Sequence, residues 1–267
     1  MTTSEAAHIT IHSKNDIQRI TQMTTETINR QLDTLGFSGM KTVLQRQEYN
    51  PDHMKLSFNE RLYQMCESEI NERNNRKIKR LLSQSKLKQK DASIEQLQHL
   101  PKRGIDRGEI LSLATCEFIN KKQNILITGA TGVGKSYLAQ ALAKAAIHEG
   151  HSARYYRINK MLEEIKLARL DGTYTKTLNK ISRYSLLILD DFGVSPLKGD
   201  ELKDLFEVIE ERTLSGSTIV TAQLPVKEWH SYLQNETIAD AMMDRLVHSS
   251  HKLELKGESM RKILSQS

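Results

Sequence analysis

The chain has 267 residues, of which 39 are Lys or Arg and 33 are Asp or Glu, so its formal net charge at pH 7 is +6. This length accommodates one α/β domain with a smaller appendage, and the mild excess of cations suits a nucleic-acid partner as well as an ordinary basic enzyme. Two cysteines without metal-ligand spacing, Cys66 and Cys116, and the lack of a signal peptide or long apolar run argue against a disulfide-stapled or membrane-spanning protein, so we expect a soluble cytoplasmic one.

The first hundred residues favour helices over strands. Residues 1–22 are polar and rich in Thr, Ser and Gln, which predicts a flexible N-terminus. Residues 23–100 contain one proline, Pro51, and almost no strand pattern, which predicts a small all-helical domain.

A long helix is predicted to begin near residue 57. Ser57, with Glu60 three residues later, has the pattern of a capping box, in which the two side chains satisfy free backbone N–H groups at the helix start. Four apolar side chains then share one face of this helix: Leu62, Met65, Cys66 and Ile70.

The most basic stretch of the chain follows on the same helix. Its cations are Arg73, Arg76, Lys77, Lys79, Arg80, Lys86, Lys88 and Lys90. Flexible cations along one face suit the phosphate backbone of duplex DNA, whereas the plainer alternative is a solvated helix face. Because no aromatic residues are interleaved for base stacking, non-specific duplex contact is favoured over sequence-specific reading of single strands.

From residue 101 to residue 267 the pattern alternates between strand and helix, which predicts a parallel sheet flanked by helices. Strands are expected at 124–128, 153–158, 185–191, 217–221 and 252–255. Helices are expected at 135–149, 159–170, 173–182, 200–213, from Pro225, and at 237–247.

The first of these strands leads into G-A-T-G-V-G-K-S, the spacing of a Walker A phosphate-binding loop. Glycines allow the backbone N–H groups to turn inward around phosphates, and the following helix points its positive dipole end at the same place. We expect Lys135 to contact the β and γ phosphates of ATP and Ser136 to ligate Mg²⁺. A glycine-rich turn that binds no nucleotide is the plainer alternative, which the full pattern disfavours. The predicted nucleotide-binding residues here are Gly129, Ala130, Thr131, Gly132, Val133, Gly134, Lys135 and Ser136.

The third strand ends in two carboxylates, as a Walker B segment does. Asp190 is expected to hold the Mg²⁺ shell, and Asp191 to accept the proton of the attacking water. An apolar strand followed by a polar turn is the alternative, but it is disfavoured after a phosphate loop. Since Asp191 is one methylene shorter than the Glu that many such proteins place there, hydrolysis is less firmly predicted than nucleotide binding.

Four further polar residues are candidates for contact with the nucleotide. If the sheet has the usual order for such ATPases, the fourth strand lies between the metal strand and the phosphate loop, and Thr221 and Gln223 stand where a γ-phosphate sensor would be. Polar strand ends are also common without function. Arg245 and Arg261 are suited either to phosphate contact or to an ordinary exposed position, and their spacing does not decide between the two.

The chain resembles the IstB-type transposition helper ATPases, which are AAA+ P-loop proteins related to DnaC helicase loaders and more distantly to DnaA initiators. The resemblance covers about residues 28–262 and rests on the Walker segments, T-A-Q-L-P, D-R-L-V-H and G-E-S-M-R, together with L-S-F-N-E-R-L at the long helix and R-G-I-D-R at 103–107. It implies an AAA+ domain at 101–267. In this chain T-A-Q replaces the T-S-N frequent in such proteins, which leaves the sensor residue open between Thr221 and Gln223.

This resemblance implies specific roles and partners. Arg245 would be an arginine finger that completes the ATP site of a neighbouring subunit in a homo-oligomer, and Arg261 would be a second sensor in its own subunit. Family members bind duplex DNA and recruit a transposase. The basic long helix is one candidate surface for DNA, and a second consists of cations on the helices after the second strand: Lys166, Arg169, Lys176 and Lys180.

The sequence therefore predicts an ATP-dependent DNA-binding oligomer that marks target DNA for a transposase. A helicase loader that prefers single-stranded DNA is the alternative within the same fold. A nucleotide-gated scaffold with little turnover is the alternative from another class.

Overall fold

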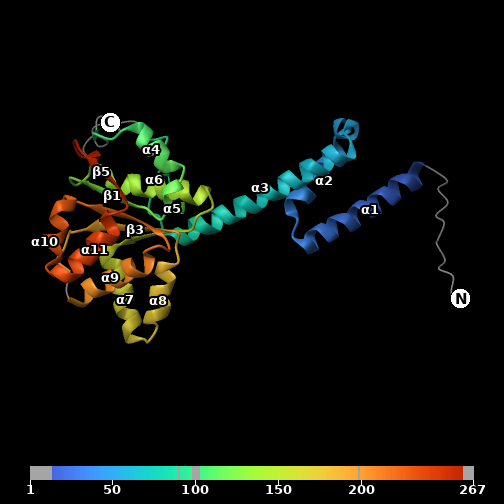
Figure 1. Cartoon of the computed structure of the whole chain (residues 1–267). Helices are drawn as coiled ribbons and strands as arrows, with labels where there is room; N and C mark the ends of the chain where they lie inside the picture. Colours follow the sequence, from blue (N-terminus) through green and yellow to red (C-terminus); the bar gives the residue numbers. More distant parts are fainter. Residues whose placement is uncertain (1–13, 90, 98–102, 198, 261–267) are drawn as a thin grey trace. The chain divides into compact units, whose positions relative to one another are not determined.

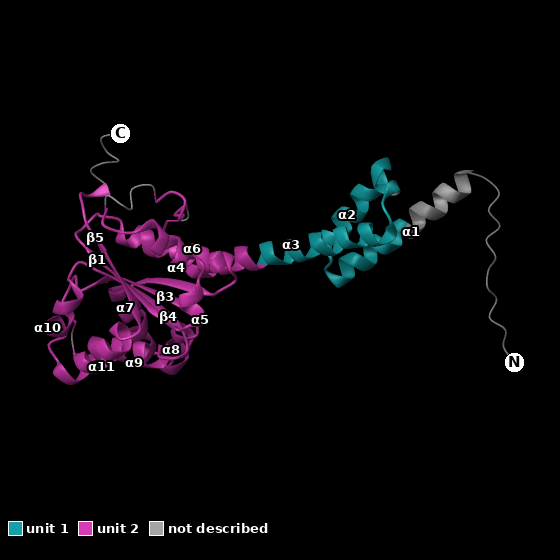
Figure 2. Cartoon of the chain, turned by 45° about the horizontal axis from the view of Figure 1, so that its top comes forward, with its two compact units in different colours: residues 1–76 teal, residues 77–267 magenta. Residues whose placement is uncertain are grey.

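The computed structural model describes residues 14–89, 91–97, 103–197 and 199–260. The chain forms two compact units, Met1–Arg76 and Lys77–Ser267, which are coloured separately in Figure 2. The division lies inside helix α3 (Phe58–Ser85), earlier than the expected boundary near residue 100. The reason is that Leu81 and Leu87 are buried in the hydrophobic core of the second unit.

The first unit is helical, with α1 (Lys14–Leu35), α2 (Ser38–Tyr49), the 3₁₀ helix η1 (Pro51–Lys55) and the first part of α3. The prediction of a flexible segment through residue 22 is wrong for residues 14–22, which already belong to α1, while residues 1–13 lie outside the described part. Ile17 and Ile20 are spaced one helical turn apart, a pattern that the polar composition of the segment concealed.

Helices α2 and α3 meet at Gly39. A Cβ atom at this position would lie 2.5 Å from the Ser68 carbonyl oxygen, so only glycine permits the approach. The Gly39 N–H donates a 2.8 Å hydrogen bond to the buried Glu69 carboxylate, which also accepts from Arg73 at 2.7 Å. The hydrogen bonds from Arg73 and Gly39 lower the pKa of Glu69 against the opposing effect of desolvation. Glu69 thus fastens α2 to α3.

The predicted capping box opens α3. The Ser57 N–H donates to Glu60 Oε2 at 2.8 Å, and the Glu60 N–H donates to Ser57 Oγ at 3.3 Å. The apolar face predicted to follow remains largely uncovered by the described residues, since Leu62 is 38% and Ile70 53% exposed.

The second unit is built on a five-stranded parallel sheet with the order β2-β3-β4-β1-β5. Its strands are β1 (Asn124–Gly129), β2 (Ala153–Arg157), β3 (Leu186–Phe192), β4 (Ser217–Ala222) and β5 (Ser250–Leu255). The order places β4 between β3 and β1, as predicted. The predicted fold class, a parallel α/β sheet flanked by helices and preceded by a small helical unit, is therefore confirmed.

Helices cover both faces of this sheet (Figure 1). On one face Ile125 and Ile127 pack with α4 (Arg107–Ala114), α5 (Glu117–Asn120), α6 (Lys135–His148) and the end of α3. On the other face Leu126 packs with a second set of helices. That set consists of α7 (Ile158–Leu170), α8 (Tyr174–Ser182), α9 (Gly199–Arg212), η3 (Val226–Glu228), α10 (Trp229–Leu233) and α11 (Glu236–Val247). The inner strands β1, β3 and β4 are buried on both sides, which explains their nearly continuous apolar runs, whereas the edge strand β5 alternates between buried and exposed residues.

Within the described segments, no helix is both long and apolar enough to span a bilayer.

Candidate nucleotide-binding site

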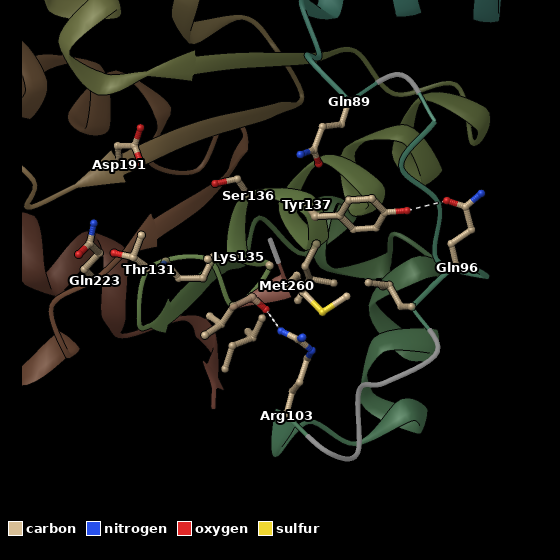
Figure 3. Close-up of a pocket in the computed structure, with 16 residues that line it drawn as sticks. Gln89, Gln96, Arg103, Thr131, Lys135, Ser136, Tyr137, Asp191, Gln223 and Met260 are labelled. Atoms are coloured by element: carbon tan, nitrogen blue, oxygen red, sulfur yellow. Dashed lines mark hydrogen bonds between the residues drawn. The ribbon is translucent and has the colours of Figure 1, made fainter. Parts of the chain in front are cut away.

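A cavity of about 470 Å³ opens at the carboxyl ends of β1, β3 and β4. Its wall includes the segment from Thr131 to Leu138, with Asp191, Gln223 and Met260 contributed by other parts of the chain (Figure 3). Open α/β sheets bind their ligands at this edge, where loops follow the strands.

The loop glycines are required by geometry. Gly129 and Gly132 have φ values of +142° and +84°, which L side chains rarely adopt. A Cβ at Gly129 would lie 2.2 Å from the Leu255 carbonyl oxygen, and one at Gly132 would lie 2.2 Å from Ser259 Oγ. The loop therefore packs closely against the segment after β5, and substitution of either glycine would displace it.

Lys135 lies at the centre of this loop. Its ammonium group donates to the carbonyl oxygens of Gly129 at 2.7 Å and Ala130 at 2.8 Å. Burial lowers the pKa of Lys135, and the charges of Asp190 and Asp191 act in the opposite direction. A cation held by carbonyl groups at the N-terminus of α6 is suited to bind the phosphates of a nucleotide.

Asp190 is buried and accepts hydrogen bonds from three hydroxyl groups. The donors are Ser136 Oγ at 2.7 Å, Tyr155 Oη at 2.5 Å and Thr221 Oγ1. Desolvation and the adjacent Asp190 raise the pKa of Tyr155, so the phenol stays protonated and acts as a donor. This network fixes the orientation of the Asp190 carboxylate.

Ser136 and Asp190 fit a magnesium site. Mg²⁺ prefers oxygen ligands and keeps several waters, so one hydroxyl and one carboxylate beside substrate phosphates suffice. Across the described ranges, no group of three or more His, Cys, Asp or Glu residues is arranged to cage a metal. The observed donor set therefore suits a metal that is bound together with a nucleotide.

A β-bulge positions Asp191. Leu189 pairs with Val220 and Phe192 with Ala222, so Asp190 and Asp191 both lie opposite Thr221. Asp191 has a φ of +67°, and its N–H donates to Thr221 Oγ1 at 3.3 Å. Its carboxylate contacts the Arg157 guanidinium at 3.3 Å. The bulge thus turns Asp191 toward the cavity while Asp190 stays buried.

The two sensor candidates occupy different positions. Thr221 is buried against Asp190, whereas Gln223 is exposed and lines the cavity. Arg245 does not line this cavity: its guanidinium pairs with Glu210 and lies 5.4 Å from the Phe206 ring centroid. Arg261 lies outside the described residues.

The candidate DNA contacts on α3 are not equivalent. Arg73 and Arg76 bond to Glu69 at 2.7 Å and 3.3 Å, which offsets part of their charge. Lys77, Lys79, Arg80, Lys86 and Lys88 are exposed in the second unit. Lys90 lies outside the described residues. The freer cations of α3 are therefore in its C-terminal part and the segment that follows.

The second candidate surface includes a hollow of about 720 Å³. Lys176 and Lys180 line it together with Arg183, a cation that sequence reasoning missed. Lys166 is exposed on α7, whereas Arg169 pairs with Asp204 and lies 4.0 Å from the Tyr174 ring centroid. Arg169 is thus held by contacts within the second unit and is the cation of this set that has the largest part in stabilising it.

Sequence reasoning also missed several residues around the nucleotide cavity. Arg103 lines the cavity and donates to the Val133 carbonyl oxygen, and burial lowers its pKa. The R-G-I-D-R segment at 103–107 contributes to the family resemblance, which by itself implies no role for Arg103. From β2, the Tyr155 hydroxyl contacts Asp190 and the Arg157 guanidinium contacts Asp191. The only sequence signal for these contacts was that the two polar side chains are two residues apart at the end of a strand and so share one face.

Comparisons with known proteins agree with this geometry. The model of the family described as IstB-like ATP binding protein matches residues 30–267. The insertion sequence ATP-binding protein y4pL of Sinorhizobium fredii is 38% identical over 231 residues, covering 86% of this chain and 94% of that protein. A Pseudomonas fluorescens protein, named as an ATP-binding protein of insertion sequence IS1162, is 39% identical over 203 residues, covering 76% and 87%.

Solved structures share the fold at low identity. The structure of DnaI aligns with a TM-score of 0.52 at 20% identity, covering 67% of this chain and 94% of that chain. The DnaC helicase loader aligns with a TM-score of 0.51 at 20% identity, covering 62% and 98%. The replication initiator DnaA, bound to AMPPCP and single-stranded DNA, has a TM-score of 0.50 at 17% identity, covering 66% and 54%.

Proposed function

The chain belongs to the IstB-like ATP-binding protein family, and from this premise we propose that it is an ATPase that assembles on duplex DNA with ATP and recruits a transposase during insertion-sequence transposition. The observation that carries the proposal is the meeting of Lys135, Ser136, Asp190 and Asp191 at one edge of the sheet, within a chain that also presents exposed cations on α3. The names of the relatives, as ATP-binding proteins of insertion sequences, support the biological setting.

The site residues divide the work of hydrolysis. Lys135 and the loop N–H groups bind and orient the phosphates, while Ser136 and Asp190 hold Mg²⁺, which neutralises phosphate charge when bound. Asp191, directed into the cavity by the bulge, orients a water molecule and accepts its proton. Gln223 faces the same cavity and serves as the sensor of the terminal phosphate, whereas Thr221 orients Asp190.

Arg245 acts on a neighbouring subunit. Its absence from the cavity of its own chain, and its half-buried position against Glu210 and Phe206, suit a residue offered to another copy. Such a finger makes hydrolysis depend on assembly, because the charge that develops on the phosphoryl group is stabilised only after docking.

A mixing experiment tests this role. Arg245→Ala and Lys135→Ala are each inactive alone. Their mixture regains ATPase activity, because an Arg245→Ala subunit keeps an intact phosphate loop and receives the finger of its Lys135→Ala neighbour. A mixture that stays inactive, although both variants still co-assemble, would contradict the trans arrangement.

The DNA activity is tested with labelled random-sequence duplex and a matching single strand, each with ATP, ADP or no nucleotide. Cooperative, ATP-dependent duplex binding that weakens steeply with salt supports the proposal. Preference for the single strand would instead indicate a helicase loader. Absence of DNA binding would leave a nucleotide-gated protein scaffold.

Turnover is tested with Asp191→Asn. The change removes the proton acceptor and keeps the size of the side chain, so an ATPase switch loses hydrolysis and stays on DNA. A scaffold whose assembly needs only bound ATP would release DNA as the unmodified protein does.

A further inference from the structure

The segment after α3 forms one wall of the nucleotide cavity. Gln89, Gln96 and Leu97 line the cavity opposite the phosphate loop. In Figure 3 the hydroxyl group of Tyr137 points toward the side chain of Gln96. The Tyr137 hydroxyl donates to Gln96 Oε1 at 2.7 Å and accepts from the Ser93 N–H at 3.3 Å. This wall is therefore attached to α6, the helix that follows the phosphate loop.

Gln140 makes the strongest part of that attachment. Only 2% of its surface is exposed, and it does not line the cavity. Its Oε1 accepts hydrogen bonds from the backbone N–H groups of Lys88 at 2.7 Å and Gln89 at 2.9 Å. Its Nε2 donates to the Ser136 carbonyl oxygen at 3.1 Å. One side chain thus joins the start of α6 to the backbone that follows α3.

A second chain of contacts reaches the same point. The Lys88 ammonium lies 5.7 Å from the Tyr155 ring centroid, and the Tyr155 hydroxyl donates to Asp190 at 2.5 Å. Lys88 is therefore linked to each proposed magnesium ligand through one intervening side chain. Gln140 connects it to Ser136, and Tyr155 connects it to Asp190.

The backbone at this point depends on Gln140. Helix α3 ends at Ser85, and Lys86 adopts a left-handed φ of +56°, so the next N–H groups leave the helical pattern. Backbone N–H groups near a protein interior need a partner, and a single buried amide oxygen supplies it for two consecutive residues. A displacement of α6 on nucleotide binding would therefore be passed to residues 86–89.

We propose that Gln140 is a positioning residue that couples occupancy of the nucleotide site to the placement of the basic segment formed by Lys79, Arg80, Lys86 and Lys88. Nucleotide binding, by fixing the start of α6, fixes this segment in the arrangement that contacts DNA phosphates. The DNA half of this inference rests on the proposed function, whereas the coupling of residues 86–89 to the nucleotide site does not.

Hydrogen exchange tests the coupling in the full-length protein without DNA. In the unmodified chain, a non-hydrolysable ATP analogue with Mg²⁺ slows exchange of the amides of residues 86–89 by about tenfold, the middle of the usual range for coupled sites. Gln140→Leu removes both hydrogen-bonding arms at similar volume, so these amides exchange quickly with and without the analogue. Affinity for the analogue stays within about threefold, because Gln140 does not line the cavity.

Two further variants separate coupling from a general loss of structure. Gln140→Glu keeps the acceptor for the Lys88 and Gln89 N–H groups but lacks the Nε2 donor to the Ser136 carbonyl oxygen, so these amides stay protected without the analogue and most of the nucleotide effect is lost. Gln84→Leu is a matched control, since Gln84 has an exposed side chain close to the same segment, and it behaves as the unmodified chain. If Gln140→Leu does not fold, as judged by Trp229 fluorescence, Gln140→Glu decides the question.

The DNA measurement gives an independent readout. In both Gln140→Leu and Gln140→Glu the ratio of duplex affinities with and without the ATP analogue falls about tenfold. A nucleotide effect of wild-type size in Gln140→Leu, or in Gln140→Glu with the analogue bound, would overturn the inference. If the unmodified protein binds no DNA, the proposed function fails, and the exchange data alone judge the role of Gln140.

Discussion

Replacement of Arg212 by leucine is expected to destabilise the second unit strongly. Arg212 lies in the last turn of α9 with 2% of its surface exposed, and no carboxylate of the described residues pairs with it. Its guanidinium donates to the carbonyl oxygens of Ser182 at 3.0 Å and Tyr184 at 2.8 Å, to that of Ser217, and to Thr218 Oγ1 at 3.1 Å. Arg212 thus joins the end of α8 to the start of β4.

The magnitude follows from the groups that lose their donor. The three nearest carbonyl groups would be left without this partner, at about 1–3 kcal/mol each, while a fourth, that of Ile181, would lose only a long contact of 3.5 Å. The leucine variant also avoids the desolvation cost of burying a charge without an acidic partner, which offsets this loss by several kcal/mol. The net loss from Arg212→Leu is therefore about 2–4 kcal/mol, a large part of the roughly 5–15 kcal/mol typical of folded proteins.

Urea unfolding followed by fluorescence measures this loss. Trp229 is the only tryptophan of the chain and is buried against Phe192, so its emission reports on the second unit. With a slope of about 1–3 kcal/mol per M, the midpoint should fall by roughly 1–2 M. Arg183→Leu is the control, because this arginine is exposed. Equal midpoints for the two variants would refute the argument that Arg212 satisfies these carbonyl groups.

Three other predictions follow from contacts described above. A thiol reagent should modify the exposed Cys66 quickly and the buried Cys116 only after unfolding, since burial raises the pKa of Cys116 to about 11; rapid labelling of both would contradict this. Asp190→Asn should weaken nucleotide binding at least about tenfold with Mg²⁺ and little in EDTA, measured by titration calorimetry, because the variant loses an anionic magnesium ligand. The capping box should weaken in acid. Hydrogen bonds from Ser57 lower the pKa of Glu60, so its contribution is present above the ordinary Glu pKa and is lost as the pH falls through the lowered value. Far-UV circular dichroism should show this helix loss in the unmodified chain and a smaller loss in Ser57→Ala, which keeps only the hydrogen bond from the backbone N–H of residue 57.

The sequence predicted the second unit better than the first. Alternating strand and helix patterns placed the five strands within about two residues, because the inner strands β1, β3 and β4 have apolar runs bounded by turn residues. The phosphate loop was legible for the same local reason, since its glycines and Lys135 act within eight consecutive residues.

Contacts between distant segments could not be predicted in this way. Gln140, Tyr155 and Arg157 acquire their partners only through the sheet order and the return of residues 86–97 over α6. The unit boundary was misplaced for a related reason. Nothing in the local pattern of α3 distinguishes Leu81, which packs with the sheet, from Ile70, which is exposed.

The left-handed backbone at Asp191 has a consequence for which side chains this position can accept. Among residues other than glycine, Asp and Asn tolerate such a φ most readily. Exchange of Asp191 for Glu keeps the charge but adds the conformational cost of a longer side chain in that region, whereas exchange for Asn keeps the backbone and removes the charge. The left-handed backbone at this position thus explains the presence of Asp as well as its role as a proton acceptor does.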